Sequence, residues 1–151
     1  MNKKTINGRT VFGAFECVSF PSLKIGDTIA KIDTGAYSGA LHCSQIKLTI
    51  NKSEGYKLLK FTPINDNMEE IQTKDFFVKY VKASNGHSMR RYLIDTDIVI
   101  NDKRYNIRIG LAKRDGMDKQ VLIGRQFLQR NAILVDVNIN KQYEKDYKGV
   151  L

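Results

Sequence analysis

Apolar and polar residues alternate over two neighbouring segments in the middle of the chain, which is the pattern of half-buried β-strands. The positions that share one face are Tyr92, Ile94, Thr96, Ile98 and Ile100 in the first segment and Tyr105, Ile107 and Ile109 in the second. The chain also contains 25 Ile and Val residues against 18 Leu and Ala residues. Because β-branched residues favour strands over helices, these features predict a mostly antiparallel, all-β fold.

Turn signals divide the rest of the chain into further strands. Strands are predicted over residues 10–20, 28–33, 40–50, 56–62, 74–82, 90–100, 105–109 and 132–137. Residues 84–87 read Ser-Asn-Gly-His, and Asn-Gly is a strong hairpin signal because both residues accept a positive φ. A single short helix is predicted over residues 124–131. We therefore expect a barrel-like β domain with one helix near the C-terminus.

The length of 151 residues is that of a single domain, and no Gly/Ser-rich linker interrupts it. We expect the core to span about residues 10–137 and residues 138–151 to form a polar, loosely held tail. No apolar run is long enough to cross a membrane, and the basic N-terminus lacks the apolar stretch of a signal peptide. These observations predict a cytoplasmic protein that does not associate with a membrane.

The cysteines and histidines do not follow a metal-binding pattern. They are Cys17, Cys43, His42 and His87, without a Cys-x-x-Cys or His-Glu-x-x-His spacing. A phosphate-binding Gly-x-x-x-x-Gly-Lys-[Ser/Thr] loop is also missing from the sequence. We expect no metal and no cofactor. His42 and Cys43 are adjacent on a predicted strand, so their side chains point to opposite faces and do not form a thiol–imidazole pair.

Asp33 stands where an apolar strand ends, and Thr34 and Gly35 follow it. A carboxylate at such a position needs hydrogen-bond donors, and Gly35 allows the backbone to come close to it. The tripeptide alone more often forms an ordinary turn. A second motif near the C-terminus adds weight, because residues 121–128 place an apolar triplet and Gly124 directly before the predicted helix.

In their order along the chain, these motifs resemble those of the retropepsin-like aspartic peptidases. More narrowly, the chain resembles a bacterial family that is catalogued as ATP-dependent zinc proteases. The similarity spans about residues 10–137. The segments that carry it are residues 31–36 (Lys-Ile-Asp-Thr-Gly-Ala), Ser38, Leu41-His42, residues 114–117 (Arg-Asp-Gly-Met) and residues 122–128 (Leu-Ile-Gly-Arg-Gln-Phe-Leu).

The resemblance implies a closed β-barrel and a role for each matching residue of the Asp-Thr-Gly loop. Asp33 would be the catalytic carboxylate, and Thr34 would anchor the active-site loops to each other across a dimer. Gly35 would direct its backbone N–H toward the carboxylates, and Ala36 would line the substrate cleft.

Two further segments take roles by the same resemblance. The hairpin of residues 79–92 would be the flap over the cleft. The tip of this hairpin is formed by Ser84, Asn85, Gly86 and His87. Gly124 and Arg125 would support the substrate cleft, although Arg125 equally suits a structural cap or ion pair. Despite the name of the bacterial family, the sequence has neither an ATP loop nor a zinc-protease motif, so we expect neither ligand.

Only one Asp-Thr-Gly occurs in the chain, whereas the chemistry of aspartic peptidases needs two carboxylates. Two carboxylates about 3 Å apart share one proton, so that one activates a water while the other donates to the scissile carbonyl. We therefore expect a homodimeric aspartic endopeptidase in which Asp33 of each subunit meets on a twofold axis.

The formal net charge is +9, and residues 79–125 carry 11 basic against 5 acidic side chains. This excess is explained either by a solvated surface or by steering of an acidic, Glu-rich substrate. A basic RNA-binding β-barrel is the alternative from another class, but acidic residues are interleaved and no base-stacking motif is evident, which disfavours nucleic acid. A catalytically inactive retropepsin-like domain for peptide binding or dimerisation is a further alternative.

Overall fold

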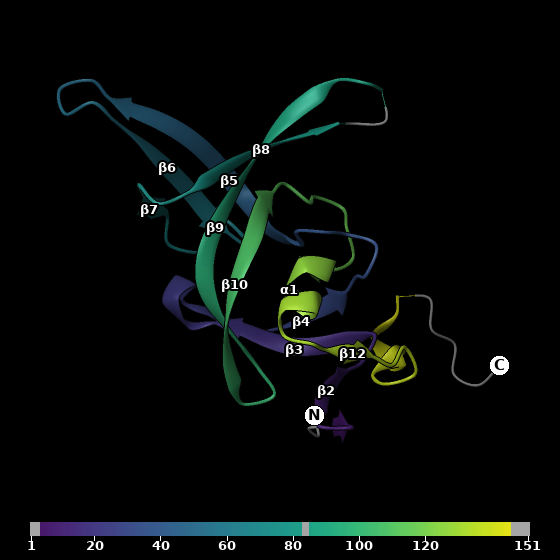
Figure 1. Cartoon of the computed structure of the whole chain (residues 1–151). Helices are drawn as coiled ribbons and strands as arrows, with labels where there is room; N and C mark the ends of the chain where they lie inside the picture. The colour runs from purple at the N-terminus through teal and green to yellow at the C-terminus, as the bar shows by residue number, and fades with distance from the viewer. Residues whose placement is uncertain (1–3, 83–84, 146–151) are drawn as a thin grey trace.

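The computed structural model describes residues 4–82 and 85–145 (Figure 1). The strands are β1 Lys4–Ile6, β2 Arg9–Phe12, β3 Phe15–Phe20, β4 Ile25–Ile32, β5 Ala40–Asn51, β6 Tyr56–Pro63, β7 Ile71–Thr73, β8 Phe77–Lys82, β9 Ser88–Ile100, β10 Lys103–Ala112, β11 Val121–Ile123 and β12 Leu134–Val135. The helical segments are η1 Pro21–Leu23, α1 Arg125–Arg130 and η2 Lys141–Tyr143. None of the helices in the described ranges has the length and apolar character that a membrane span requires.

Six strands form a closed barrel, in the order β10, β9, β3, β4, β11 and β5 (Figure 1). The barrel closes where β5 pairs with β10 in parallel, with Ala40 opposite Gly110. The other pairings are antiparallel except for β4 with β11. The expected all-β barrel with a short helix is therefore confirmed. Outside it, β5 continues into a long hairpin with β6, and β8 pairs with β9.

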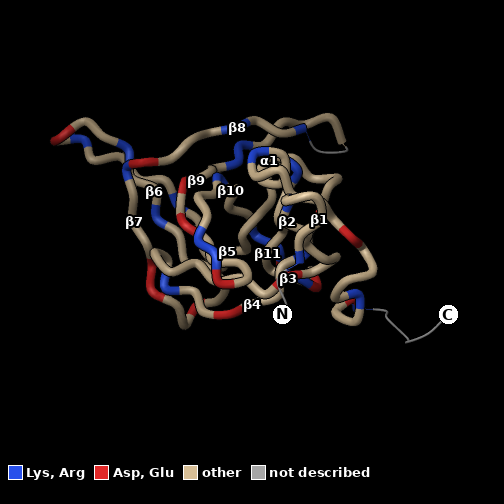
Figure 2. The backbone as a smooth tube through the Cα atoms, turned by 60° about the horizontal axis from the view of Figure 1, so that its bottom comes forward, with Lys and Arg blue, Asp and Glu red and all other residues tan. Residues whose placement is uncertain are grey.

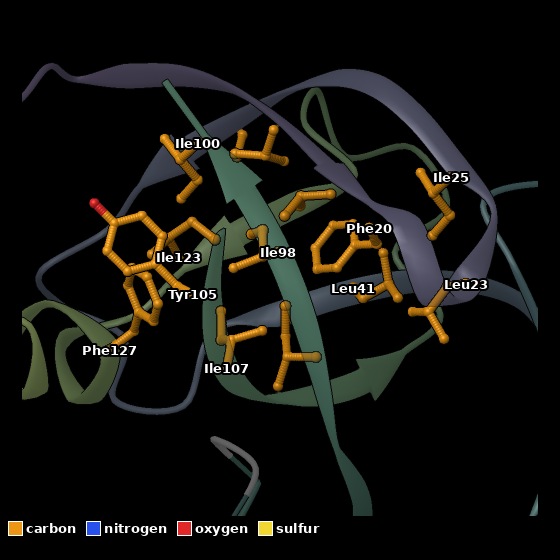
Figure 3. Packing of buried hydrophobic residues seen from close by; sticks show 14 of the residues in the cluster. Phe20, Leu23, Ile25, Leu41, Ile98, Ile100, Tyr105, Ile107, Ile123 and Phe127 are labelled. Carbon is orange, nitrogen blue, oxygen red and sulfur yellow. The ribbon is translucent and has the colours of Figure 1, made fainter. Parts of the chain in front are cut away.

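The barrel is filled by the alternating apolar positions that the sequence pattern identified (Figure 3). Ile98 and Ile100 of β9 have no exposed surface, and Ile107 of β10 is 4% exposed. Helix α1 contributes Phe127, whose ring stands edge-on to that of Tyr105 with centroids 5.3 Å apart. Because burying such a side chain contributes about 1.5–3 kcal/mol, the helix is held to the barrel mainly by this face.

The predicted strand over residues 10–20 is in fact two strands. The chain breaks at Gly13, where an added Cβ would lie 2.4 Å from the carbonyl oxygen of Ile139, so only glycine fits beneath this crossing segment. The buried carboxylate of Glu16 accepts the Gly13 N–H at 2.7 Å and stabilises the break. As a result, β2 pairs with β1 and β12 in a small separate sheet, while β3 enters the barrel.

The C-terminal segment is also held more firmly than expected. The predicted strand over residues 132–137 shortens to β12, and the following chain turns back over the barrel. Ala14 donates its N–H to the carbonyl of Ile139 at 2.9 Å, and the Asn140 amide donates to the carbonyl of Phe15 at 2.7 Å. The expectation of a loose tail is therefore wrong for residues 138–140, and residues 146–151 lie outside the described residues.

Candidate active site

The position of Asp33 is set by the way β11 inserts between β4 and β5. Ile123 of β11 lies opposite Ile32 in a parallel pairing with β4, and Leu122 lies opposite Ala40 in an antiparallel pairing with β5. The loop of residues 33–39, which joins β4 to β5, must therefore cross the end of β11. Asp33 is tied to this crossing, because its N–H donates to the carbonyl of Ile123 at 2.8 Å.

The Asp33 side chain is half-buried and is turned back onto its own loop. Its Oδ1 accepts the backbone N–H of Gly35 at 3.0 Å, so the glycine N–H does point at the carboxylate. A Cβ at Gly35 would lie 3.2 Å from the same oxygen, which is a tight contact. Ala36 closes the turn by donating its N–H to the Asp33 carbonyl at 3.3 Å.

Gly124 brings the loop and the start of α1 into direct backbone contact. A Cβ at this position would lie 2.4 Å from the Gly39 nitrogen and 2.6 Å from the Tyr37 carbonyl oxygen. The first helical N–H groups have no partner inside a helix. Here the loop supplies acceptors, because Arg125 donates to the Ala36 carbonyl at 2.6 Å and Gln126 donates to the Tyr37 carbonyl at 2.9 Å. Gly124 thus supports the Asp33 loop through the backbone.

Arg125 and Thr34 meet on the outer side of this loop. The Nη1 of Arg125 donates to the Thr34 carbonyl at 2.8 Å, so the arginine braces the loop backbone. The Thr34 side chain is exposed, and its hydroxyl has no hydrogen-bond partner among residues 4–82 and 85–145. The structure therefore brings Asp33, Thr34, Gly35, Ala36, Gly124 and Arg125 together in one place.

The hairpin in the expected flap position is formed by β8 and β9, with Lys82 opposite Ser88. Ser84, one of the four predicted tip residues, lies outside the described residues. At the other three, Gly86 has a φ of +84°, and the His87 N–H donates to Asn85 Oδ1 at 3.0 Å, as in an Asx turn. The stem of the hairpin reaches the Asp33 loop, because Lys79 Nζ donates to Ser38 Oγ at 3.3 Å.

A cavity of about 260 Å³ opens beside Asp33, and its wall contains residues to which sequence reasoning assigned no role. The charged side chains that line it are basic at Lys31, Arg114, Lys119 and Lys145 and acidic at Asp33, Asp118 and Glu144. Arg114 begins the Arg-Asp-Gly-Met segment that contributed to the family resemblance. This motif is the sequence signal that could have indicated Arg114, but it does not show that the segment folds beside Asp33.

The His42–Cys43 pair does not form a nucleophilic site. Burial raises the pKa of the Cys43 thiol to about 12, so this thiol stays protonated at neutral pH. His42 instead accepts the backbone N–H of Arg114 at its Nδ1, at 2.7 Å. Within the described part of the chain, no three His, Cys, Asp or Glu side chains are grouped so that they could hold a metal ion.

Curated proteins that are similar in sequence to this chain are named "Probable alpha-L-glutamate ligase". The Shewanella pealeana protein is 27% identical over 133 residues, and the Desulfotalea psychrophila protein is 26% identical over 129 residues. These matches cover 86% and 83% of this chain, but 29% and 28% of the relatives. The chain therefore spans less than a third of the length of the curated relatives it matches.

A solved structure supports the fold, and a family model supports the family. The crystal structure of the Legionella pneumophila protein Lpg0085, described as of unknown function, matches with a TM-score of 0.63 at 24% identity and covers 85% of this chain and 94% of its own. The sequence model of the RimB-like family, described as retropepsin-like aspartic endopeptidase RimB, matches residues 11–146. This chain belongs to the RimB-like family of retropepsin-like aspartic endopeptidases.

Proposed function

We propose that the chain is an aspartic endopeptidase that works as a homodimer, with one Asp33 from each subunit forming the catalytic pair. The observation that carries this proposal is the support of Asp33, which is fixed by its N–H bond to Ile123 and by the Gly35 N–H on its carboxylate. The chain belongs to a family of aspartic endopeptidases, and a carboxylate held in a fixed position in this way is suited to general acid–base catalysis.

The mechanism follows from the repulsion between two carboxylates. Held about 3 Å apart, they cannot both ionise, so the pair binds one proton. The ionised Asp33 takes a proton from a water, and that water attacks the scissile carbonyl. The protonated Asp33 of the partner donates its proton to the carbonyl oxygen. In the breakdown of the tetrahedral intermediate, the first Asp33 gives the proton that it took from water to the leaving amine nitrogen, and the C–N bond breaks. The Asp33 of the partner takes a proton back from a hydroxyl of the intermediate, which restores the shared-proton pair, and no covalent enzyme intermediate forms.

The exposed face of the loop supports dimerisation at this site. Thr34 and Gly35 are exposed in the isolated chain, although the loop backbone beneath them is firmly held. The Thr34 hydroxyl is therefore available to bond to the loop of a second copy. One chain offers a single Asp-Thr-Gly, so the site is incomplete until that copy is present.

Acidic, glutamate-rich peptides are the substrate class we propose. Lys and Arg positions gather around β8 and α1, near the Asp33 loop (Figure 2). Lys31, Arg114, Lys119 and Lys145 line the cavity that contains Asp33, together with the acidic side chains of Asp118 and Glu144. The relatives that contain a homologous segment are named as glutamate ligases, which makes glutamate chemistry a natural context for this domain. Cleavage of such peptides should weaken as salt concentration rises, because salt screens the attraction.

The decisive variant is Asp33→Asn, with Asp66→Asn in an exposed loop as the matched control. We expect cleavage of a quenched-fluorescence library of glutamate-rich peptides to fall at least about 100-fold in Asp33→Asn. The control should keep the wild-type rate. Full activity in Asp33→Asn would refute the catalytic assignment.

Subunit mixing tests the dimer separately. If wild-type chains exchange with a threefold excess of Asp33→Asn chains, about one in sixteen dimers retains both carboxylates. Activity per wild-type chain should then fall to about a quarter, while sedimentation shows a species of twice the chain mass. An active monomer, or activity that is insensitive to mixing, would contradict the shared site.

A further inference from the structure

Arg114 is held at both its backbone and its side chain. It lies between β10 and β11, and its Nε and Nη2 donate to the Lys119 carbonyl at 3.2 and 3.1 Å. Its backbone N–H donates to His42 Nδ1 at 2.7 Å. These bonds fix the guanidinium in the wall of the cavity that it shares with Asp33.

His42 is a buried imidazole that is used to hold this segment. It lies in β5 and is 6% exposed. Segments on both sides of β5 hold its backbone, because its N–H donates to the Gln120 carbonyl and its carbonyl accepts the Ile64 N–H. Since Nδ1 accepts the Arg114 N–H, the proton of the neutral ring is on Nε2, which faces Asp115 Oδ1 at 3.8 Å. The ring therefore links the core of β5 to Arg114.

The charge of Arg114 is only partly compensated. Partial burial is the main cause that lowers the pKa of Arg114; the positive charge of Arg91 adds to this effect, and Asp33 opposes it. Arg91 approaches across Gly110, where a Cβ would lie 2.9 Å from the arginine Cδ. No carboxylate in residues 4–82 and 85–145 forms an ion pair with Arg114. Asp118 and Glu144 line the same cavity, but Asp118 pairs with Lys119. The Arg114 guanidinium therefore has no carboxylate partner of its own in the described residues, and an anionic ligand would supply one.

We propose that Arg114 is a specificity-determining residue that binds the side-chain carboxylate of a substrate residue next to the scissile bond, and that His42 is a positioning residue that holds Arg114 toward Asp33. A guanidinium presents its donors in a plane that matches both oxygens of a carboxylate. This proposal rests on the proposed function, because it places the bound carboxylate beside the reacting bond.

The first experiment compares two peptides that differ by one charge. A quenched-fluorescence peptide rich in glutamate is paired with the same peptide in which Gln replaces the Glu beside the cleaved bond. Arg114→Gln should lower kcat/KM for the Glu peptide about 30-fold and for the Gln peptide less than about threefold, because only the former loses an ion pair in the cleft. Lys52→Gln, in the exposed turn between β5 and β6, removes one charge elsewhere and should leave the ratio unchanged.

A purely structural role for Arg114 predicts a different result. If Arg114 only holds the segment of residues 114–119 in place, its loss would lower kcat/KM for both peptides by the same factor. The preference for the Glu peptide over the Gln peptide would then be unchanged. That outcome overturns the proposal even if total activity falls. Thermal denaturation of each variant shows whether the fold is kept.

The positioning role of His42 is tested by a conservative pair. In His42→Asn the amide oxygen can take the place of Nδ1 as the acceptor for the Arg114 N–H, whereas His42→Leu has no acceptor. We expect the Asn variant to keep the Glu/Gln ratio within about threefold and the Leu variant to lose most of it. A folded Asn variant with the ratio of Arg114→Gln would contradict the role, as would an unchanged ratio in His42→Leu.

A binding measurement separates this proposal from the catalytic one. Fluorescence anisotropy of the labelled Glu peptide is measured with Asp33→Asn and with the Asp33→Asn/Arg114→Gln double variant, neither of which depends on cleavage. We expect affinity to be about tenfold weaker in the double variant, and this result would support Arg114 even if the wild type cleaves nothing. Equal binding, or no binding to either protein, would overturn the role of Arg114 and leave Asp33 to be judged by its own test.

Discussion

The Asp33 loop and the β8–β9 hairpin border the same site but are held in different ways. The loop of residues 33–39 touches β11 and α1 through backbone atoms, with hydrogen bonds to Ile123 and from Arg125. The hairpin exposes Tyr80 and Met89, which are 69% and 53% exposed, and it reaches the loop through a lysine side chain. Segments with few buried contacts open at low free-energy cost. The molecule thus combines a loop that is held through its backbone with a hairpin that is held through exposed side chains.

The largest expected effect comes from disturbing the fixed side. Gly124→Ala places a methyl group against the backbone of Gly39 and Tyr37, and backbone cannot give way as a flexible side chain can. We expect a loss of about 3 kcal/mol or more in the free energy of unfolding, measured by urea denaturation, together with loss of activity.

Gly26→Ala is the matched control. A Cβ there meets nothing within 4 Å, and its φ lies outside the positive range, so its stability should stay within about 0.5 kcal/mol of wild type. If both alanine variants are equally stable, the backbone contact between the loop and α1 is not what holds the Asp33 loop.

A smaller effect is expected where the hairpin meets the loop. Lys79→Met removes the bond to Ser38 and a cation about 5.1 Å from the Tyr37 ring. Because both contacts are exposed, we expect little change in stability but a change of about two- to fivefold in KM. Lys82→Met, on the same exposed strand, is the control. A double-mutant cycle with Ser38→Ala shows whether the two residues act together, and additive effects would exclude this contact as a latch.

The smallest effect concerns the base of the hairpin. Arg108 stacks on Phe77 at 3.8 Å and binds both oxygens of Asp95 at 2.7 and 3.0 Å. The hydrogen bond to Arg108 is the main cause that lowers the pKa of Asp95. A lowered folded-state pKa means that the pair stabilises the fold fully above the unfolded pKa of about 3.9 and ceases to do so as pH falls through the folded value.

In Asp95→Asn, the free energy of unfolding should therefore fall slightly less between neutral and acidic pH than it does in the wild type. Urea midpoints at pH 6 and pH 2.5 should differ less in this variant than in the wild type, while Asp66→Asn should show the wild-type difference. A wild-type difference in Asp95→Asn would mean that the pair does not brace the hairpin.

Most of the barrel could be predicted from the sequence because its strands are half-buried and therefore alternate. The break between β2 and β3 could not, since Gly13 is needed only because Ile139 crosses it from the other end of the chain. The C-terminal segment departs from the expected loose tail for the same reason, because its partners lie near the other end of the chain. Its polar residues form hydrogen bonds with the backbone around Phe15. A hydropathy pattern cannot predict hydrogen bonds to such distant parts of the chain.

In the candidate site, too, local motifs could be recognised from the sequence, whereas contacts between distant segments could not. Asp33, Gly35 and Gly124 belong to short motifs, so the sequence could indicate them together with the family. His42 and Arg114 also lie in segments that carry the resemblance, but nothing in those segments indicates the hydrogen bond that joins the two residues across 72 positions. Their relation depends on β5 and the segment before β11 becoming neighbours, which only the folded barrel reveals.

The insertion of β11 between β4 and β5 also has a consequence for biosynthesis. Asp33 leaves the ribosome early, but the carbonyl of Ile123 that binds its N–H is made about ninety residues later. Contacts between such distant segments form late and slowly in folding. In the nascent chain, the backbone of Asp33 therefore lacks this hydrogen bond until β11 has been translated, and the loop takes its final position only then.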